Sequence, residues 1–331
     1  MKTKALYGFS PQLAPFRHKT PPEQVALLQS WGVNAVFGGY EEAAFVSAIH
    51  RAGMRIYAEL ACFVGEAWWE RAPASRPITE TGQPLQQLKW YCGVNPSTPE
   101  VRQAQLSAFE ALLRDYDLDG VWLDFIRWPC LWEGADPARP RTSFDAATLA
   151  QFQRDTGLEL PYDNPVSLLL KRYESAWTAW RCEQITTWVT EAKATLKRIK
   201  PQATLGLFSI PWRLADFDGA ILNIIGQDFQ ALSEHVDVFS PMVYHAMCGR
   251  PPAWIGEVVE EVHALSQKPV WPIVQSVDKP RQLSAEEYGQ ALDVGLTHPA
   301  SGGVLVFTLE GALQPEKLAI TQAKLRNRPR R

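Results

Sequence analysis

Short apolar segments with strand propensity alternate with longer segments of helical periodicity along the whole chain, and this alternation constrains the fold more than any other feature. The expected strands are residues 4–9, 34–38, 54–60, 121–123, 204–209, 236–243, 269–275 and 303–308. The expected helices are residues 21–30, 41–51, one that begins near 98, 145–155, 166–199, 228–234, 253–265, one that begins at 284, and 315–325. Eight strands that alternate with helices predict a (β/α)8 TIM barrel.

An open, doubly wound sheet would show the same alternation. A dinucleotide-binding sheet of that kind carries a glycine-rich phosphate-binding turn after its first strand, and none follows residue 9. The loops after the third, fourth and fifth strands are long, at residues 62–97, 129–165 and 210–225. Because no linker divides the pattern, we expect a single barrel over residues 1–325, followed by a basic tail at 326–331.

Charge and composition exclude several classes of protein. The net charge is −3, whereas a nucleic-acid-binding protein usually presents a basic face, so no nucleic-acid partner is expected. No apolar run approaches the roughly 18 residues of a membrane span. The first residues enter a strand without the apolar core of a secretory signal, which leads us to expect a cytoplasmic protein. The five cysteines are scattered and form no CxxC pair, so they indicate neither disulfides nor a zinc site.

The fourth expected strand ends in ionisable residues. Asp124 closes an apolar run that begins after Gly120, and Arg127 and Trp128 follow it before Pro129. An ionised carboxylate buried without a partner costs several kcal/mol, so Asp124 needs a reason to be there. One reading is a structural ion pair between Asp124 and Arg127. The other, which we favour, is a catalytic or sugar-binding carboxylate in the mouth of the barrel.

In a TIM barrel the chemistry takes place at the carboxyl ends of the strands. Besides Asp124, three acids are candidates for a catalytic carboxylate there: Glu59, Asp228 and Glu310. Each also has a structural reading, since Glu59 could pair with Arg127, Asp228 could cap a helix and Glu310 could be a solvated loop residue. The candidates for contact with substrate near the strand ends are polar or aromatic residues, namely Arg127, Trp128, Trp212, Tyr244, His245 and Gln275. Asn95, in the long loop after the third strand, could contact a sugar hydroxyl or hold a turn. Further tryptophans, Trp68, Trp69, Trp90 and Trp132, could line a sugar groove or simply pack.

The residue types at the strand ends favour one kind of chemistry. Lysine is nearly absent there, which disfavours a Schiff-base aldolase. A single histidine disfavours a metal hydrolase, although His245 with Glu59 and Asp124 could still hold an ion. The remaining carboxylates and aromatic rings are typical of glycoside cleavage, in which one carboxyl group protonates the leaving oxygen and a second acts as nucleophile or base.

Four segments of the chain resemble the uncharacterised family-10-type glycosyl hydrolase-like barrels, relatives of the bacterial enzymes that cut poly-glucosamine matrix sugars. The segments are residues 52–59, 94–102, 116–129, and 226–229 with 236–244, and Phe144, Phe152, Gly157 and the Trp180-Arg181 pair add to them. The resemblance implies a (β/α)8 barrel and O-glycosyl hydrolysis, and Asp124 and Arg127 match its motif. Tyr57 and Glu59 stand where these proteins often have Trp or His, so the resemblance does not carry a substrate with it.

The sequence therefore predicts a hydrolase that cleaves an oligo- or polysaccharide with two carboxyl groups and without metal or cofactor. Two other hypotheses stay open. A barrel that binds carbohydrate without cleaving it is favoured if no second carboxylate lies near Asp124. A metal-dependent hydrolase is favoured if His245, Glu59 and Asp124 come together.

Overall fold

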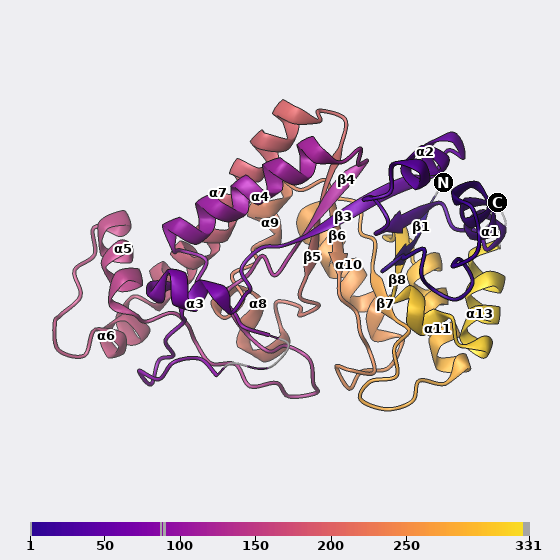
Figure 1. Ribbon diagram of the computed structural model, residues 1–331. Coiled ribbons are helices and arrows are strands. Elements are labelled where there is room, and N and C mark those ends of the chain that lie inside the picture. Colours follow the sequence, from indigo (N-terminus) through magenta and orange to yellow (C-terminus); the bar gives the residue numbers. More distant parts are fainter. Residues whose placement is uncertain (1, 87, 89–90, 327–331) are drawn as a thin grey trace.

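The eight apolar segments form the parallel strands of one sheet in the computed structural model of the protein, which describes residues 2–86, 88 and 91–326 (Figure 1). The strands are β1 (Thr3–Tyr7), β2 (Ala35–Phe37), β3 (Arg55–Ala61), β4 (Gly120–Asp124), β5 (Thr204–Ser209), β6 (Val238–Pro241), β7 (Ile273–Gln275) and β8 (Gly303–Phe307). Their order is β6-β5-β4-β3-β2-β1-β8-β7, and all pairs are parallel. A parallel bridge between Phe239 and Val270 brings β6 beside the chain that leads into β7. The predicted (β/α)8 barrel is thus confirmed.

Helices cover the outside of this barrel. They are α1 (Pro21–Ser30), α2 (Ala43–Arg51), α4 (Pro99–Asp115), α7 (Glu174–Ile199), α9 (Phe229–Ser233), α10 (Trp254–Ser266), α11 (Ala285–Thr297) and α13 (Pro315–Arg326). The boundaries of α1 and α11 follow local signals, because proline occupies the first turn of α1 and the Ser284 hydroxyl accepts a hydrogen bond from the Glu287 N–H at the start of α11. The part of the predicted basic tail that follows Arg326 lies outside the described residues.

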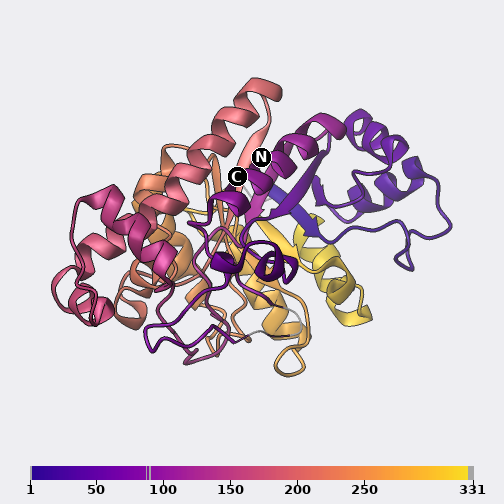
Figure 2. The same cartoon turned by 60° about the vertical axis from the view of Figure 1, so that its left-hand side comes forward.

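Two of the three long loops, those after β3 and β5, contain short helices that the sequence pattern did not indicate. They are α3 (Ala67–Arg71), the single turns at Pro73–Ser75 and Asp216–Asp218, and α8 (Ala220–Asn223), while α12 (Leu309–Ala312) follows β8. Within the loop after β4, α5 (Ala146–Thr156) matches the predicted helical segment. The α5 helix and α6 (Pro165–Arg172) lie at the periphery of the molecule in both views (Figures 1 and 2).

The prediction of one continuous helix over residues 166–199 is wrong. The chain breaks at Tyr173, whose φ of −117° and ψ of 20° are not helical, and α6 and α7 are separate. Neither glycine nor proline marks the break, so it is set by how the two helices pack and not by local sequence. No helix in the described ranges combines the length and apolar character needed to cross a bilayer.

The interior of the barrel is filled by large rings beneath the mouth. Trp122 on β4 is fully buried and stacks on Trp271, with ring centroids 5.4 Å apart. Its Nε1 donates a hydrogen bond to the Ser240 hydroxyl at 3.0 Å. The ring lies directly against Gly206 on β5, where an added Cβ would come within 2.0 Å of it. This layer closes the barrel and supports the side chains at the strand ends.

Candidate active site

Glu59 and Asp124 are the carboxyl groups that the barrel brings together. The register of β3 and β4 pairs Glu59 with Trp122 and Ala61 with Asp124. Because side chains alternate along a strand, Asp124 points to the same side as the inward-facing Trp122, and so does Glu59 opposite that residue. Both acids are partly exposed at the mouth, and they lie close enough for each to shift the pKa of the other.

The two carboxyl groups shift each other's pKa. Burial and the adjacent charge of Asp124 raise the pKa of Glu59 to about 8. Burial also raises the pKa of Asp124, but the charge of Arg127, the Phe125 N–H and the hydrogen bond from Glu59 oppose this rise. Like charges in contact resist double ionisation, which is why one member of such a pair stays protonated. Of the two acids, Glu59 is the one whose raised pKa keeps it protonated at neutral pH.

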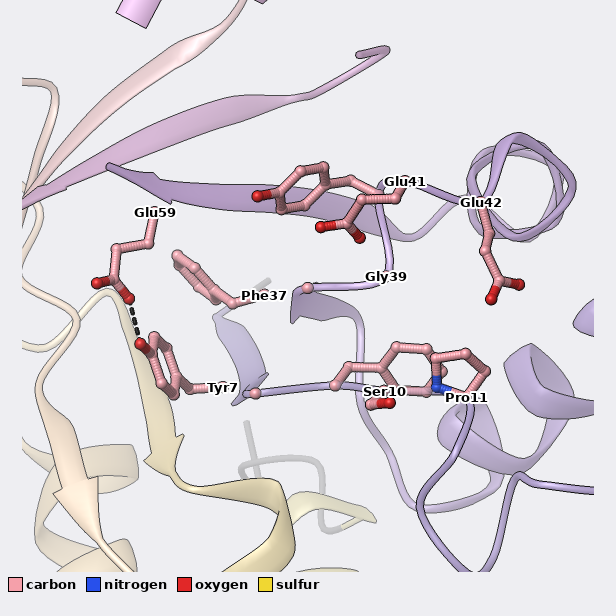
Figure 3. A pocket seen from close by; sticks show the side chains of 12 residues that line it. Tyr7, Ser10, Pro11, Phe37, Gly39, Glu41, Glu42 and Glu59 are labelled. Carbon is pink, nitrogen blue, oxygen red and sulfur yellow. Dashed lines mark hydrogen bonds between the residues drawn. The ribbon is translucent and has the colours of Figure 1, made fainter. Parts of the chain in front are cut away.

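The Tyr7 hydroxyl completes this cluster from β1. It donates a hydrogen bond to Oε2 of Glu59 (Figure 3). Burial and the charges of Glu59 and Asp124 raise the pKa of Tyr7 well above its usual range, so the phenol stays protonated. The hydrogen bond in turn lowers the pKa of Glu59, against the effects of burial and Asp124. Tyr7 thus orients the Glu59 carboxyl group and limits how basic it becomes.

A pocket of about 520 Å³ opens beside Tyr7 and Glu59. Its walls come from the ends of β1, β2 and β3, and the side chains in Figure 3 surround it. The lining residues are Tyr7, Gly8, Phe9, Ser10, Pro11, Phe37, Gly38, Gly39, Tyr40, Glu41, Glu42 and Glu59. The protonated carboxyl group of Glu59 is therefore accessible to a molecule in the pocket.

The turn after β4 is strained at the site. Phe125 has a φ of 50°, a left-handed conformation that bulky residues rarely adopt. In this conformation its N–H donates a 2.7 Å hydrogen bond to Oδ1 of Asp124. Such strain persists only where the surrounding structure enforces it, and it is common at functional sites.

Two buried side chains hold this turn in place. Gln227 donates from Nε2 to the Ile126 carbonyl oxygen at 3.2 Å and accepts at Oε1 from the Ile210 N–H at 3.0 Å. Trp128 donates from Nε1 to the Arg181 carbonyl oxygen at 3.0 Å. These contacts tie the turn to the loop after β5 and to α7. The predicted substrate contact Trp128 is completely buried, so the structure places it in this scaffold and not in the pocket.

Arg127 is buried, and none of the ion pairs among the described residues includes it. Its guanidinium lies over the rings of Tyr91 and Phe125, 5.3 and 5.0 Å from their centroids, and Nη1 donates to the Tyr91 hydroxyl at 3.4 Å. The Nε atom is buried and has no hydrogen-bond partner among the described residues. Arg127 therefore acts on Asp124 through its charge and does not form the structural ion pair that was the alternative reading of the sequence.

The other two predicted catalytic acids lie apart from the pair. Asp228 caps α9, accepting hydrogen bonds from the Gln230 and Ala231 N–H groups at 3.0 and 3.1 Å. Glu310 is exposed on α12. The structure brings neither to Asp124. The carboxylate of Asp228 accepts the hydrogen bonds of the helix cap, and the carboxylate of Glu310 is solvated.

Several side chains predicted to contact substrate form hydrogen bonds within the protein. The Gln275 amide accepts from the Met247 N–H and donates to the carbonyl oxygens of Val277 and Lys279. Asn95 is buried and donates to Thr148 and Asp145 within the long loops. In contrast, Tyr244 is at the site, since the charges of Asp124 and Glu59, together with burial, raise the pKa of its phenol.

Two further aromatic or imidazole candidates pack away from the pocket. Trp212 is buried edge-to-face against Phe217, with centroids 5.1 Å apart. His245 is completely buried, and its Nε2 lies 3.1 Å from Oε1 of Glu287. His245 therefore does not join Glu59 and Asp124, and the described part of the chain has no group of three or more His, Cys, Asp or Glu side chains arranged to hold a metal ion.

The tryptophans of the long loops mostly pack. Trp132 is buried beside Tyr244, with ring centroids 5.5 Å apart. Trp69 donates from Nε1 to the Gly93 carbonyl oxygen and lies under the Arg76 guanidinium, while Trp68 packs against the core. Trp90 lies outside the described residues.

Sequence reasoning missed two residues of this region, Tyr7 and Glu133. Tyr7 is the last residue of β1, and its position at a strand end is a signal that could have identified it. Glu133 lies in the loop after β4, where its pKa is raised by burial and by the charge of Asp124 and lowered by that of Arg127. No periodicity marks a residue in an irregular loop, so the sequence offers no comparable signal for Glu133.

The fold is similar to the barrels of several solved glycoside hydrolases. The glycoside hydrolase domain of PgaB (BpsB) from Bordetella bronchiseptica superimposes with a TM-score of 0.71 at 13% identity, covering 97% of this chain and 98% of that one. The β-galactosidase of the psychrophilic Marinomonas ef1 gives 0.68 at 11% identity, covering 98% of this chain and 59% of that one. A GH42 β-galactosidase, Gan42B, gives 0.65 at 11% identity, with coverages of 98% and 56%. This chain thus spans only part of both β-galactosidases.

No curated protein matches the sequence. Residues 48–250, more than half of the chain, match the family described as Glycosyl hydrolase-like 10, and they include both Glu59 and Asp124. The chain belongs to the glycosyl hydrolase-like 10 family.

Proposed function

We propose that this protein hydrolyses O-glycosidic bonds of an oligo- or polysaccharide, with Glu59 as the proton donor and Asp124 as its ionised partner. The observation that carries the proposal is that neighbouring strand ends bring Glu59 and Asp124 together, with Glu59 facing a pocket and held by the Tyr7 hydroxyl. A carboxyl group with a pKa of about 8 remains protonated at neutral pH, which is what a general acid for a glycosidic oxygen requires.

The surroundings of the pair support this role. Glu59 lines the pocket, so a glycosidic oxygen placed there can reach its proton. When Glu59 gives up that proton, the negative charge of Asp124 would oppose the new carboxylate. The Tyr7 hydroxyl and the charge of Arg127 stabilise the anionic pair at that moment. The pKa of Glu59 thus stays near neutral pH, where the group can both hold and release its proton.

The pair also bears on the alternative hypotheses. A barrel that only binds carbohydrate was favoured if Asp124 had no carboxylate neighbour, and Glu59 is such a neighbour. A metal-dependent hydrolase at His245, Glu59 and Asp124 lacks support, because His245 contacts Glu287 instead.

The test is a hydrolysis screen over α- and β-linked oligosaccharides of glucose, galactose and glucosamine. Wild type is compared with Glu59→Gln and Asp124→Asn, and with Glu234→Gln as a control for an exposed glutamate outside the mouth. We expect wild type and Glu234→Gln to cleave a common substrate. Glu59→Gln should lose at least 100-fold in kcat, the usual contribution of a general acid. Sugar binding without cleavage by the wild type would contradict the proposal and favour a binding barrel.

A further inference from the structure

The pocket beside Glu59 is lined by acidic side chains and by no basic ones. Glu41, Glu42 and Glu59 all line it. No lysine, arginine or histidine of the described chain is among the lining residues. Because Glu59 is protonated at neutral pH, the negative charge at this pocket comes from Glu41 and Glu42.

A tight turn between β2 and α2 positions these two glutamates. It begins with Gly38 and Gly39, whose φ angles of 105° and 75° lie in the region that favours glycine. A Cβ added to Gly39 would come within 2.7 Å of the ring of Phe9, so the turn lies directly against that ring. The backbone that carries Glu41 and Glu42 is therefore fixed at the edge of the pocket.

The fold does not use the charges of Glu41 and Glu42 for its own contacts. Glu42 occupies the N-cap position of α2, but its side chain makes no capping hydrogen bond. None of the ion pairs among the described residues includes either glutamate. Both side chains are exposed, and exposed glutamates are ionised at neutral pH. Figure 3 shows both carboxyl groups extending from the turn toward the side of the pocket that Ser10 and Pro11 form.

The other walls of the pocket strengthen the effect of these charges. The rings of Tyr7, Phe9 and Phe37 line it, and Phe9 and Phe37 are buried. A cleft that is lined by charges of one sign and has apolar walls concentrates the electric field, because the walls screen it less than water does. A negatively charged group that enters this pocket is repelled, whereas a hydroxyl group can donate a hydrogen bond to a glutamate.

We propose that Glu41 and Glu42 determine the specificity of the pocket, which accepts sugar units without acidic groups and excludes uronic acids and sulfated sugars. This inference rests on the proposed glycoside hydrolysis and narrows the class of its substrate. The two glutamates act through their charge on the sugar unit that lies beside Glu59. The substrate is thus an oligo- or polysaccharide whose bound unit carries no carboxylate or sulfate.

The experiment uses two ligands that differ in charge and hardly in shape. The first is the oligosaccharide that wild type cleaves fastest in the screen, with its primary hydroxyl groups oxidised to carboxylates. The second is the same compound with those carboxylates converted to primary amides. Both carry a planar group at the same carbon, and only the uronate is charged. Each is measured at pH 7 as a competitive inhibitor of the cleavage of the unmodified oligosaccharide.

Wild type should bind the uronamide much more tightly than the uronate. We expect the inhibition constant of the uronate to be about 100-fold higher, with about tenfold from each glutamate. In Glu41→Gln/Glu42→Gln this ratio should fall below about tenfold, and each single variant should give an intermediate ratio. The control is Glu183→Gln/Glu234→Gln, which removes two exposed charges outside the pocket and should keep the wild-type ratio.

Salt separates an effect of charge from a change in the shape of the turn. At 1 M NaCl the Debye length is about 3 Å, so the ratio of the two inhibition constants should fall in wild type. It should change little in Glu41→Gln/Glu42→Gln, where the charges are already absent. A glutamate that only shapes the turn would alter the binding of both ligands alike and would leave their ratio insensitive to salt.

Two outcomes overturn the inference. If the uronamide competes no better than the uronate with wild type, the two charges do not select the ligand. If the ratio persists in Glu41→Gln/Glu42→Gln at an unchanged melting temperature, other groups exclude the acid. The single variants decide the question if the double variant does not fold. In each of these cases wild type still cleaves the unmodified oligosaccharide, so the proposed function stands. If wild type cleaves nothing in the screen, the proposed function falls and the inference falls with it.

Discussion

Tyr7 and Glu59, on β1 and β3, are joined by a hydrogen bond from the phenol to Oε2 of the carboxyl group. The strand β2 lies between theirs, so the bond crosses the inside of the barrel mouth. Its effect on the pKa of Glu59 is opposite to that of Asp124, because the phenol stabilises the ionised carboxylate and Asp124 destabilises it. The acid strength of Glu59 is thus set by two neighbours that can be removed one at a time.

Removal of Asp124 should make Glu59 a stronger acid. In Asp124→Asn the adjacent negative charge is lost, so the pKa of Glu59 should fall from about 8 toward its usual range. The ¹³C chemical shift of the labelled Glu59 carboxyl carbon measures this directly. Asp216→Asn, which alters a buried carboxylate paired with Arg213, is the control and should not change the titration. A Glu59 that titrates near 4.5 in wild type would contradict the raised pKa.

Removal of the Tyr7 hydroxyl should shift the pKa of Glu59 in the opposite direction. Tyr7→Phe takes away a donor that favours ionised Glu59, so the pKa of Glu59 should rise. If Glu59 is the general acid, the alkaline limb of the pH profile of kcat should move to higher pH. Tyr288→Phe removes the hydroxyl of another buried tyrosine, which is bonded to Thr321, and serves as control. An alkaline limb that does not move in Tyr7→Phe would argue against Glu59 as the acid.

Protonation of Glu59 should also be visible in the stability of the fold. The folded protein holds this proton up to about pH 8, whereas the ordinary value is 4.5, so between these values the native state binds more protons than the unfolded chain. The stabilisation from Glu59 is complete below about pH 4.5 and declines as the pH rises to 8, with a slope of at most about 1.4 kcal/mol per pH unit. Urea unfolding at several pH values should show a smaller decline in Glu59→Gln. Equal slopes in both proteins would refute the raised pKa.

The ring layer beneath the site should not tolerate added volume at Gly206. A Cβ there would lie 2.0 Å from Cε2 of Trp122, and the ring cannot move because its Nε1 is bonded to Ser240. Gly206→Ala should therefore lower the free energy of unfolding by about 3 kcal/mol or more, at the upper end of overpacking effects. Gly289→Ala is the control, since its nearest side-chain atom is 3.5 Å away and alanine favours the helix. Thermal unfolding distinguishes the two.

Substitution of Asp228 should affect stability and not cleavage. Asp228→Ala removes the cap of α9 and should cost about 1 kcal/mol, while Asp228→Asn can still cap. Both folded variants should keep the kcat of wild type. Loss of cleavage in Asp228→Asn at an unchanged melting temperature would restore Asp228 as a catalytic acid.

The sequence by itself determined the barrel and the positions of its strand ends. Periodicity, proline and glycine mark each element locally, and a parallel strand order requires that the ends of all strands meet at one mouth. This reasoning was sufficient to place Asp124 and Glu59 among the candidates. It also placed Gln275, Asn95 and Trp128 there, since it uses only the position of a residue along the chain.

Only the tertiary structure decided which of these side chains are available for chemistry. The register of β3 and β4 brings Glu59 to Asp124, and register depends on contacts between segments far apart in sequence. The buried backbone groups of the long loops need hydrogen-bond partners, and the Gln275 side chain is one of them. The same loops bury Asn95 and Trp128. A polar residue at a strand end is free for catalysis only if no loop has taken its hydrogen bonds, and that depends on packing in three dimensions.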